Sequence, residues 1–133
     1  MLSITLTAAG ALTLVNLWLG FRTSRVRVGR KILVGTGGDP LLEARMRAQA
    51  NFVEYAPFFL ILLGLVEYSR GTQAWLWYVA AAFVLARVAH PFGMERPAPN
   101  PLRMGGILVT WALLVVLAAY ALALPYLAMR TAP

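Results

Sequence analysis

The sequence predicts an all-α membrane protein, a four-transmembrane-helix bundle that forms a single domain over residues 1–133. Hydrophobic residues make up 60% of the chain and charged residues 13%, and a soluble domain of this length could not bury so much apolar surface. Four segments are nearly free of charge, and each is close to the roughly 20 residues that cross a bilayer as a helix. Basic residues gather in two of the connections between these segments.

The first two helices are predicted from an uncharged segment and from a helix-start signal. Leu2 to Phe21 carries no charge and is too long for the core of a signal peptide, so we expect it to be retained. The second apolar segment, Ala48 to Val66, carries only Glu54. Asp39-Pro40 precedes it in the order typical of a helix start, an N-cap oxygen followed by a proline.

The last two helices follow from equally long apolar segments. Gly71 to Ala86 is uncharged and continues past Arg87 to Pro91, and Met104 to Met129 is again uncharged. The four predicted helices therefore cover residues 2–22, 41–69, 73–91 and 104–129.

The distribution of basic residues predicts the orientation in the membrane. By the positive-inside rule the first and third connections lie in the cytosol and both termini lie on the opposite side. The same rule, together with contacts to lipid head groups, accounts for most of the net charge of +7, so we predict no nucleic-acid partner. The residues concerned are Arg22, Arg25, Arg27, Arg30 and Lys31 in the first connection, and Arg96 and Arg103 in the third.

Two compositional features limit the chemistry. The chain has no cysteine, which excludes disulfides, thiolate metal sites and a cysteine nucleophile, so any reactive thiol must come from a ligand. His90 is the only histidine, and a single histidine without a second ligand does not predict a metal or haem site.

The second helix carries polar residues that membrane insertion does not explain. At 100° per residue, Arg47, Asn51, Glu54 and Tyr55 fall on one face. A charge near the centre of a span costs roughly 2.5–3.5 kcal/mol, and such residues usually face a bundle interior or a wet cleft. The alternatives are a ligand site and an Arg47–Glu54 pair that only holds helices together.

Further cations are expected on the same side of the membrane. Arg87 and His90 lie three residues apart near the end of the third helix, and Arg103 opens the fourth. The cations outnumber the carboxylates, which favours an anionic small molecule, with Glu54 available for an ammonium group. For His90 the alternative is a cap at the helix end before Pro91.

The segment 47–57, RAQANFVEYAP, resembles the second-helix signature of the MAPEG family, the membrane-associated proteins in eicosanoid and glutathione metabolism. Its R-A-Q-x-N-x-x-E-Y-x-P pattern is particularly close to that of the leukotriene C4 synthases, and the whole chain resembles the short bacterial branch. There are three departures from those synthases: His90 replaces a tyrosine, Met94 replaces a following one, and the connection before Arg103 is about two residues longer, which makes Arg96 the next arginine to consider.

The resemblance implies a homotrimer in the bacterial inner membrane, with glutathione as co-substrate in clefts between subunits near the cytosol. Arg103 would be the catalytic residue that stabilises the glutathione thiolate. Arg47 suits a glutathione carboxylate and Glu54 its α-ammonium group. Gln49 points away from the polar face and would serve the neighbouring cleft, and the choice between two first-helix arginines stays open. The implied glutathione-binding residues are Arg47, Gln49, Asn51, Glu54, Tyr55, Arg87, His90 and Arg22 or Arg25.

The function predicted from these features is a glutathione transferase or peroxidase acting on a lipophilic electrophile or hydroperoxide. The sequence does not distinguish the two activities, since both begin with the same thiolate, and it does not identify the lipophilic substrate. A non-catalytic lipid-binding member of the same family is the alternative. A small multidrug exporter is similar in length, but exporters of that kind place an essential carboxylate in the first helix, which has none here.

Overall fold

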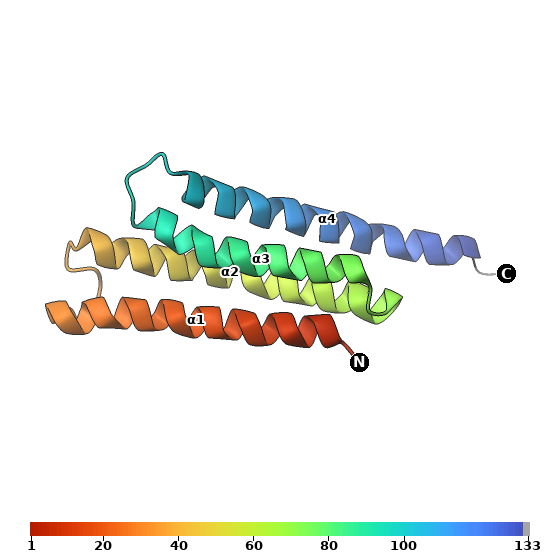
Figure 1. Cartoon of the computed structure of the whole chain (residues 1–133), viewed down its shortest axis with the longest axis horizontal. Coiled ribbons are helices and arrows are strands. Elements are labelled where there is room, and N and C mark those ends of the chain that lie inside the picture. The colour runs from red at the N-terminus through yellow and green to blue at the C-terminus, as the bar shows by residue number, and fades with distance from the viewer. Residues whose placement is uncertain (132–133) are drawn as a thin grey trace.

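The computed structural model describes residues 1–131, the last two by backbone alone, and residues 132–133 of the predicted domain lie outside the described part. The described residues form four helices: α1 (Ser3–Arg30), α2 (Pro40–Arg70), α3 (Ala74–Met94) and α4 (Pro101–Thr131) (Figure 1). All four are long and apolar enough to cross a membrane. The predicted fold class, an all-α protein of four transmembrane helices, is confirmed.

The helices run alternately up and down the bundle (Figure 1). The start of α1, the end of α4 and the α2–α3 connection lie at one end, and the other two connections lie at the opposite end, which we call the basic end. Helix α2 contacts the three other helices, whereas α1 and α4 do not contact each other anywhere in the described residues. At the centre, the rings of Phe59 in α2 and Phe83 in α3 stack with their centroids 3.7 Å apart.

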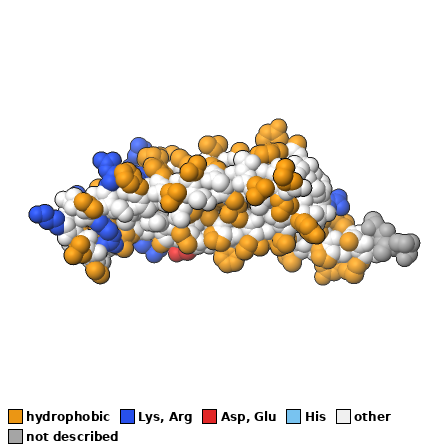
Figure 2. All heavy atoms as spheres, turned by 90° about the horizontal axis from the view of Figure 1, so that it is seen from below, with side chains coloured by type: hydrophobic (Ala, Val, Ile, Leu, Met, Phe, Trp, Pro, Cys, Tyr) orange, Lys and Arg blue, Asp and Glu red, His pale blue; other side chains and the backbone are white. Residues whose placement is uncertain are grey.

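Helices α1 and α4 carry large apolar side chains on their exposed faces as well as on their buried faces. The exposed side of α1 carries large apolar side chains such as Leu14, Leu17 and Phe21. Figure 2 shows hydrophobic side chains along the length of the molecule, with Lys and Arg side chains mostly toward one end. A helix that is hydrophobic all round needs lipid or another helix outside it. The buried face of α1 recurs every three or four residues: Ile4, Ala8, Leu12, Val15, Leu19, Thr23 and Val26.

All four helices end later than expected, and α1 and α3 extend furthest beyond their expected ends. Helix α1 continues to Arg30, past the expected end at 22, because arginine is a good helix former and Val26 is still buried. Lys31, in the left-handed region at φ 56°, then ends it, with the amides of Lys31 and Ile32 bonded back to the last turn. Helix α3 continues through Pro91 to Met94, since the proline removes only one backbone donor.

The helix-start signal predicted at Asp39-Pro40 is confirmed, and it occurs a second time before α4. The Asp39 side chain accepts a hydrogen bond from the Leu42 amide at 2.9 Å. Asn100 Oδ1 likewise accepts from the Leu102 amide at 3.0 Å, and Pro101 opens the helix. Helix α4 therefore begins at Pro101, three residues before the expected start at 104.

The N-terminus of α1 is capped by a side chain from α2. Its own N-cap residue, Leu2, offers no side-chain acceptor. Glu67, 2% exposed, accepts from the amides of Ile4 at 3.0 Å and Thr5 at 2.8 Å. The hydroxyls of Thr5 and Thr72 donate to the same carboxylate. Four donors and the positive end of a helix dipole thus stabilise this buried charge.

Candidate functional site

A small cavity of about 200 Å³ lies at the basic end between α2, α3 and α4. Four of its six lining residues are site residues predicted from the sequence, and no carboxylate is among the six. Two cations, an amide and an imidazole therefore surround a space suited to an anionic group. Each helix contributes two lining residues: Arg47 and Asn51, His90 and Met94, and Arg103 and Ile107.

Arg87 lies behind this cavity rather than in its lining. Its side chain is 1% exposed. One guanidinium nitrogen donates to Asn51 Oδ1 at 2.9 Å, and the other donates to the Gly106 carbonyl at 3.0 Å. The residue therefore joins α2 and α4 through the inside of the bundle.

His90 bonds to the start of α4, not to the end of its own helix. Its Nδ1 lies 3.1 Å from the Arg103 carbonyl oxygen. A carbonyl can only accept, so Nδ1 carries the proton of this bond.

Arg103 lies in the first turn of α4. The backbone N–H groups at this helix N-terminus add a partial positive charge to the full charge of the guanidinium. Close packing of α3 on this turn requires glycine on both helices. A Cβ at Gly93 would lie 2.2 Å from the Arg103 backbone nitrogen, and one at Gly106 would lie 2.8 Å from His90 Cβ. The position of Arg103 is thus determined by backbone contact, and its exposed side chain stays available to a ligand.

Glu54 and Tyr55 lie further along the predicted polar face and do not line the cavity. Glu54 is exposed, and Tyr55 is half-buried against the hydrophobic core. Among the described residues no ion pair joins Arg47 to Glu54. Within one subunit, therefore, these two charges do not pair with each other.

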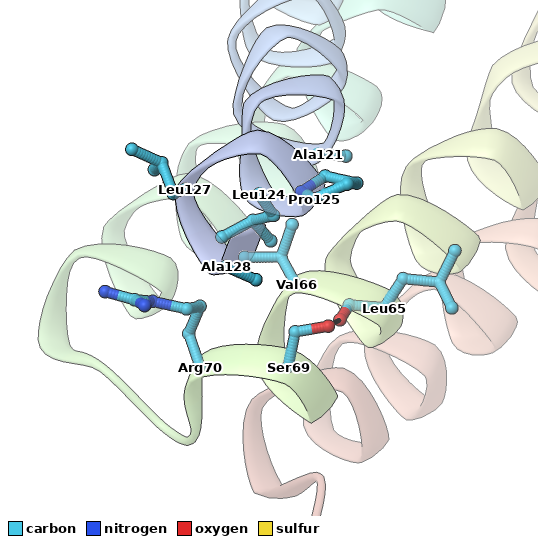
Figure 3. Close-up of a pocket in the computed structure, with 9 residues that line it drawn as sticks. All are labelled: Leu65, Val66, Ser69, Arg70, Ala121, Leu124, Pro125, Leu127 and Ala128. Atoms are coloured by element: carbon cyan, nitrogen blue, oxygen red, sulfur yellow. Dashed lines mark hydrogen bonds between the residues drawn. The ribbon is translucent and has the colours of Figure 1, made fainter. Parts of the chain in front are cut away.

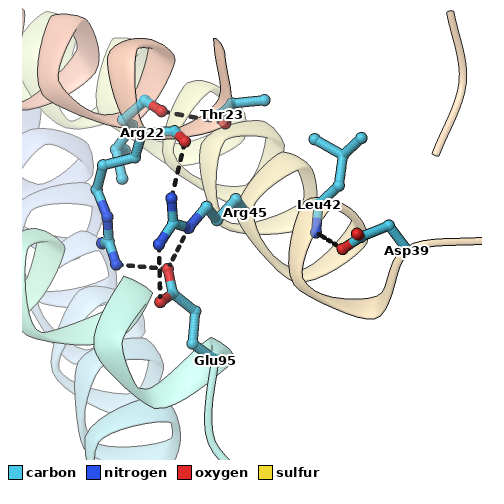
Figure 4. A network of polar contacts seen from close by, with 7 residues as sticks. Arg22, Thr23, Asp39, Leu42, Arg45 and Glu95 are labelled. Atoms are coloured by element: carbon cyan, nitrogen blue, oxygen red, sulfur yellow. Dashed lines mark hydrogen bonds and ion pairs between the residues drawn. The ribbon is translucent and has the colours of Figure 1, made fainter. Parts of the chain in front are cut away.

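Arg22, one of the two first-helix candidates, belongs to a network at the basic end (Figure 4). Its guanidinium pairs with Glu95, the residue after α3, and Glu95 also accepts from Arg45 Nε at 2.9 Å. Arg45 donates in addition to the Arg22 carbonyl at 2.9 Å. The Arg22 guanidinium also stacks near the ring of Trp18, 4.7 Å from its centroid. This network joins α1, α2 and the end of α3.

Arg25, the other candidate, is exposed, and its guanidinium lies 5.8 Å from the Phe21 ring centroid. Gln49 lies on the opposite side of α2 from the cavity, where it lines an open groove of about 530 Å³ between α1 and α2. Arg27, which the sequence did not single out, lines the same groove. Only its position in the basic connection could have marked it.

A larger groove of about 750 Å³ lies at the end opposite to the cavity (Figure 3). The ends of α2 and α4 form it, with apolar side chains along its walls and Arg70 and Ser69 at one side. No sequence pattern indicated it, because its two walls are 50 or more residues apart in the chain and consist mostly of ordinary span residues. The apolar residues are Leu65, Val66, Ala121, Leu124, Pro125, Leu127 and Ala128.

A family model for the MAPEG family matches residues 5–123, which include most of every helix. The chain belongs to the MAPEG family. The resemblance predicted from segment 47–57 is confirmed. Similar proteins are the inner membrane protein YecN of Escherichia coli strain K12 and that of Escherichia coli O6:H1 strain CFT073. Each is 28% identical over 98 residues, which cover 73% of this chain and 73% of the relative. Together with the four apolar helices, these relatives support an integral inner membrane protein.

Proposed function

We propose that this MAPEG protein binds glutathione as a homotrimer and uses its thiolate on a lipophilic electrophile or hydroperoxide, as a transferase or a peroxidase. The observation that carries the proposal is the convergence of Arg47, Asn51, His90 and Arg103 on one cavity without a carboxylate. The RAQANFVEYAP segment, which resembles the glutathione-binding signature of the family, supplies two of these residues.

Each residue has a role suited to part of the tripeptide. Arg47 offers a permanently charged fork to a carboxylate, and Asn51 adds a neutral hydrogen bond. Glu54 and Tyr55, beyond the cavity on the same helix, would hold the α-ammonium end. Arg103 would stabilise the thiolate: a free thiol has a pKa of about 8.5, and each unit by which a cation lowers that pKa represents about 1.36 kcal/mol.

The size of the cavity supports completion of the site by a neighbouring subunit. Its volume of about 200 Å³ is below the roughly 300–1,000 Å³ typical of small-molecule sites. Gln49 and Arg27 line a groove on the other side of α2. Arg25, two residues before Arg27 in the chain, is exposed. In a trimer these side chains would face the cavity of the next subunit, whereas Arg22 is occupied by Glu95.

The proposed orientation places the basic end in the cytosol and both termini in the periplasm. Most lysines and arginines lie at that end, as the positive-inside rule requires for a cytosolic face. Glutathione would then enter from the cytosol, and the lipophilic substrate would arrive through the bilayer.

Lipid binding without chemistry is the second candidate function, and the distal groove favours it. The groove combines long apolar walls with the Arg70 cation, a composition suited to a lipid with an anionic head group. The groove lies at the end of α4 and Arg103 at its start, so a lipid held in the groove would not reach a thiolate in the cavity (Figure 1).

Titration of the detergent-purified protein with glutathione and with S-hexylglutathione tests the leading proposal. Calorimetry should give a saturable heat. The free energy of unfolding should rise by RT ln(1 + [L]/Kd), about 2.7 kcal/mol at 100 times Kd, and the melting temperature should rise with it. Native mass spectrometry should show a trimer. Turnover of an aryl halide or of an organic hydroperoxide then separates transferase from peroxidase. If neither glutathione nor S-hexylglutathione binds, the glutathione proposal is rejected and the lipid-binding candidate is favoured.

A further inference from the structure

We infer that Arg87 is a positioning residue. It orients the Asn51 amide and holds the first turns of α4 in place, and it does not touch the ligand itself. The inference rests on the proposed function, because it takes the cavity beside Asn51 as the glutathione site. It differs from the sequence prediction, in which Arg87 contacts glutathione directly.

Arg87 is buried and has no charged partner among the described residues. At 1% exposure it is one of the largest fully buried side chains, and it is absent from the cavity lining. It forms no ion pair within the described residues. Its Nε is buried without a hydrogen-bond partner. A guanidinium placed in this way is held by two neutral hydrogen-bond acceptors, the Asn51 side chain and the Gly106 carbonyl, and its central carbon lies 5.9 Å from the Phe83 ring centroid.

The contact with Arg87 determines which way the Asn51 amide faces. A guanidinium has only donors, so the oxygen of the amide must be the atom that meets it at 2.9 Å. Asn51 therefore has its N–H groups left to offer to the cavity that it lines. Asn51 lines the cavity together with Arg47 and Arg103. This set of donors favours a ligand acceptor, such as a carboxylate or a peptide carbonyl, and disfavours an ammonium group.

The second contact holds the helix that carries Arg103. The Gly106 carbonyl accepts from Arg87 Nη2 at 3.0 Å and from the Thr110 hydroxyl at 2.8 Å. One turn earlier in α4, His90 holds the Arg103 carbonyl. Arg87 and His90 of α3 therefore hydrogen-bond to consecutive turns of α4. Loss of Arg87 would remove the bond to the Gly106 carbonyl and the bond to Asn51.

A double-mutant cycle on glutathione binding tests the inference. The variants are Arg87→Met, Asn51→Ala and both together, each measured by calorimetry on folded protein recovered from size-exclusion chromatography. We expect Asn51→Ala to weaken binding about tenfold in the wild-type background and at most about twofold when Arg87 is already methionine. Arg45→Met is the matched control: this arginine bonds Glu95 away from the cavity, so its loss should lower the melting temperature and leave Kd unchanged.

Each outcome decides the matter. If the two single effects multiply in the double variant, Arg87 does not act through Asn51 and the inference fails, although the proposed function stands. Wild-type affinity in Arg87→Met overturns it equally. If Arg87→Met does not fold, Arg87→Lys replaces it in the cycle, because lysine keeps the charge but lacks the planar fork whose two nitrogens reach the two acceptors. If the wild type binds no glutathione, the proposed function itself fails.

Discussion

Replacing Glu67 with glutamine should loosen the N-terminus of α1 although the two side chains have nearly the same shape. Oε1 accepts from the Ile4 amide and the Thr72 hydroxyl, and Oε2 accepts from the amide and the hydroxyl of Thr5. Glutamine keeps one acceptor oxygen and puts an NH₂ group in place of the other. One backbone N–H at the helix start then faces a donor instead of an acceptor.

The expected loss follows from these contacts. An unsatisfied buried N–H costs about 1–3 kcal/mol, and the loss of one hydroxyl bond costs about 0.5–1.5 kcal/mol. Removal of the charge from a helix N-terminus adds about 0.3–1 kcal/mol. We therefore expect Glu67→Gln to lower the apparent free energy of unfolding by roughly 2–5 kcal/mol. Glu43→Gln, the same change at an exposed position in the first turn of α2, should lose only about 0.3–1 kcal/mol.

Hydrogen exchange read by mass spectrometry provides a local measurement in detergent. The amides of residues 4 and 5 should exchange at least about tenfold faster in Glu67→Gln than in the wild type, since 1.4 kcal/mol corresponds to a factor of ten. Melting of both variants provides the global comparison. Equal exchange at these amides in Glu67→Gln and Glu43→Gln would refute the capping role of Glu67.

Three further predictions concern the site and the network at the basic end. Glu54→Gln should weaken glutathione binding by about 1.5–3 kcal/mol in calorimetry with the trimer intact; normal binding by a trimer that dissociates more readily would make Glu54 structural. Arg103→Ala should raise the pKa of the bound glutathione thiol, seen as loss of thiolate absorbance at neutral pH, and should lower kcat more than it raises KM. Arg103→Lys should restore part of that signal, and unchanged absorbance and turnover in Arg103→Ala would move the assignment to Arg96. Glu95→Gln should leave Arg22 and Arg45 without a carboxylate and reduce stability by about 1–3 kcal/mol, with Kd unchanged; a wild-type melting temperature would contradict the role of this network.

Some features of the site depend on residues close together in the chain, and the sequence predicted where those would lie. Arg47 and Asn51 are one turn apart on α2, so helical periodicity alone puts them on one face. The same local logic predicted the start of α2 at Asp39-Pro40. Applied to Asn100-Pro101, it would also have placed Arg103 in the first turn of α4.

By itself the sequence determined the membrane class, the four spans, the family and the polar face of α2, because each depends on composition or on neighbours within a few turns. Only the tertiary structure decided the partner of each charge. Arg87 meets Asn51 across 36 residues, Glu67 meets Ile4 across 63, and Arg22 meets Glu95 across 73. The sequence shows that such a side chain is charged, but its role depends on which acceptor the packing of the helices brings within about 3 Å. That is why Arg22 belongs to a structural network, Arg87 to the interior and Arg103 to the cavity.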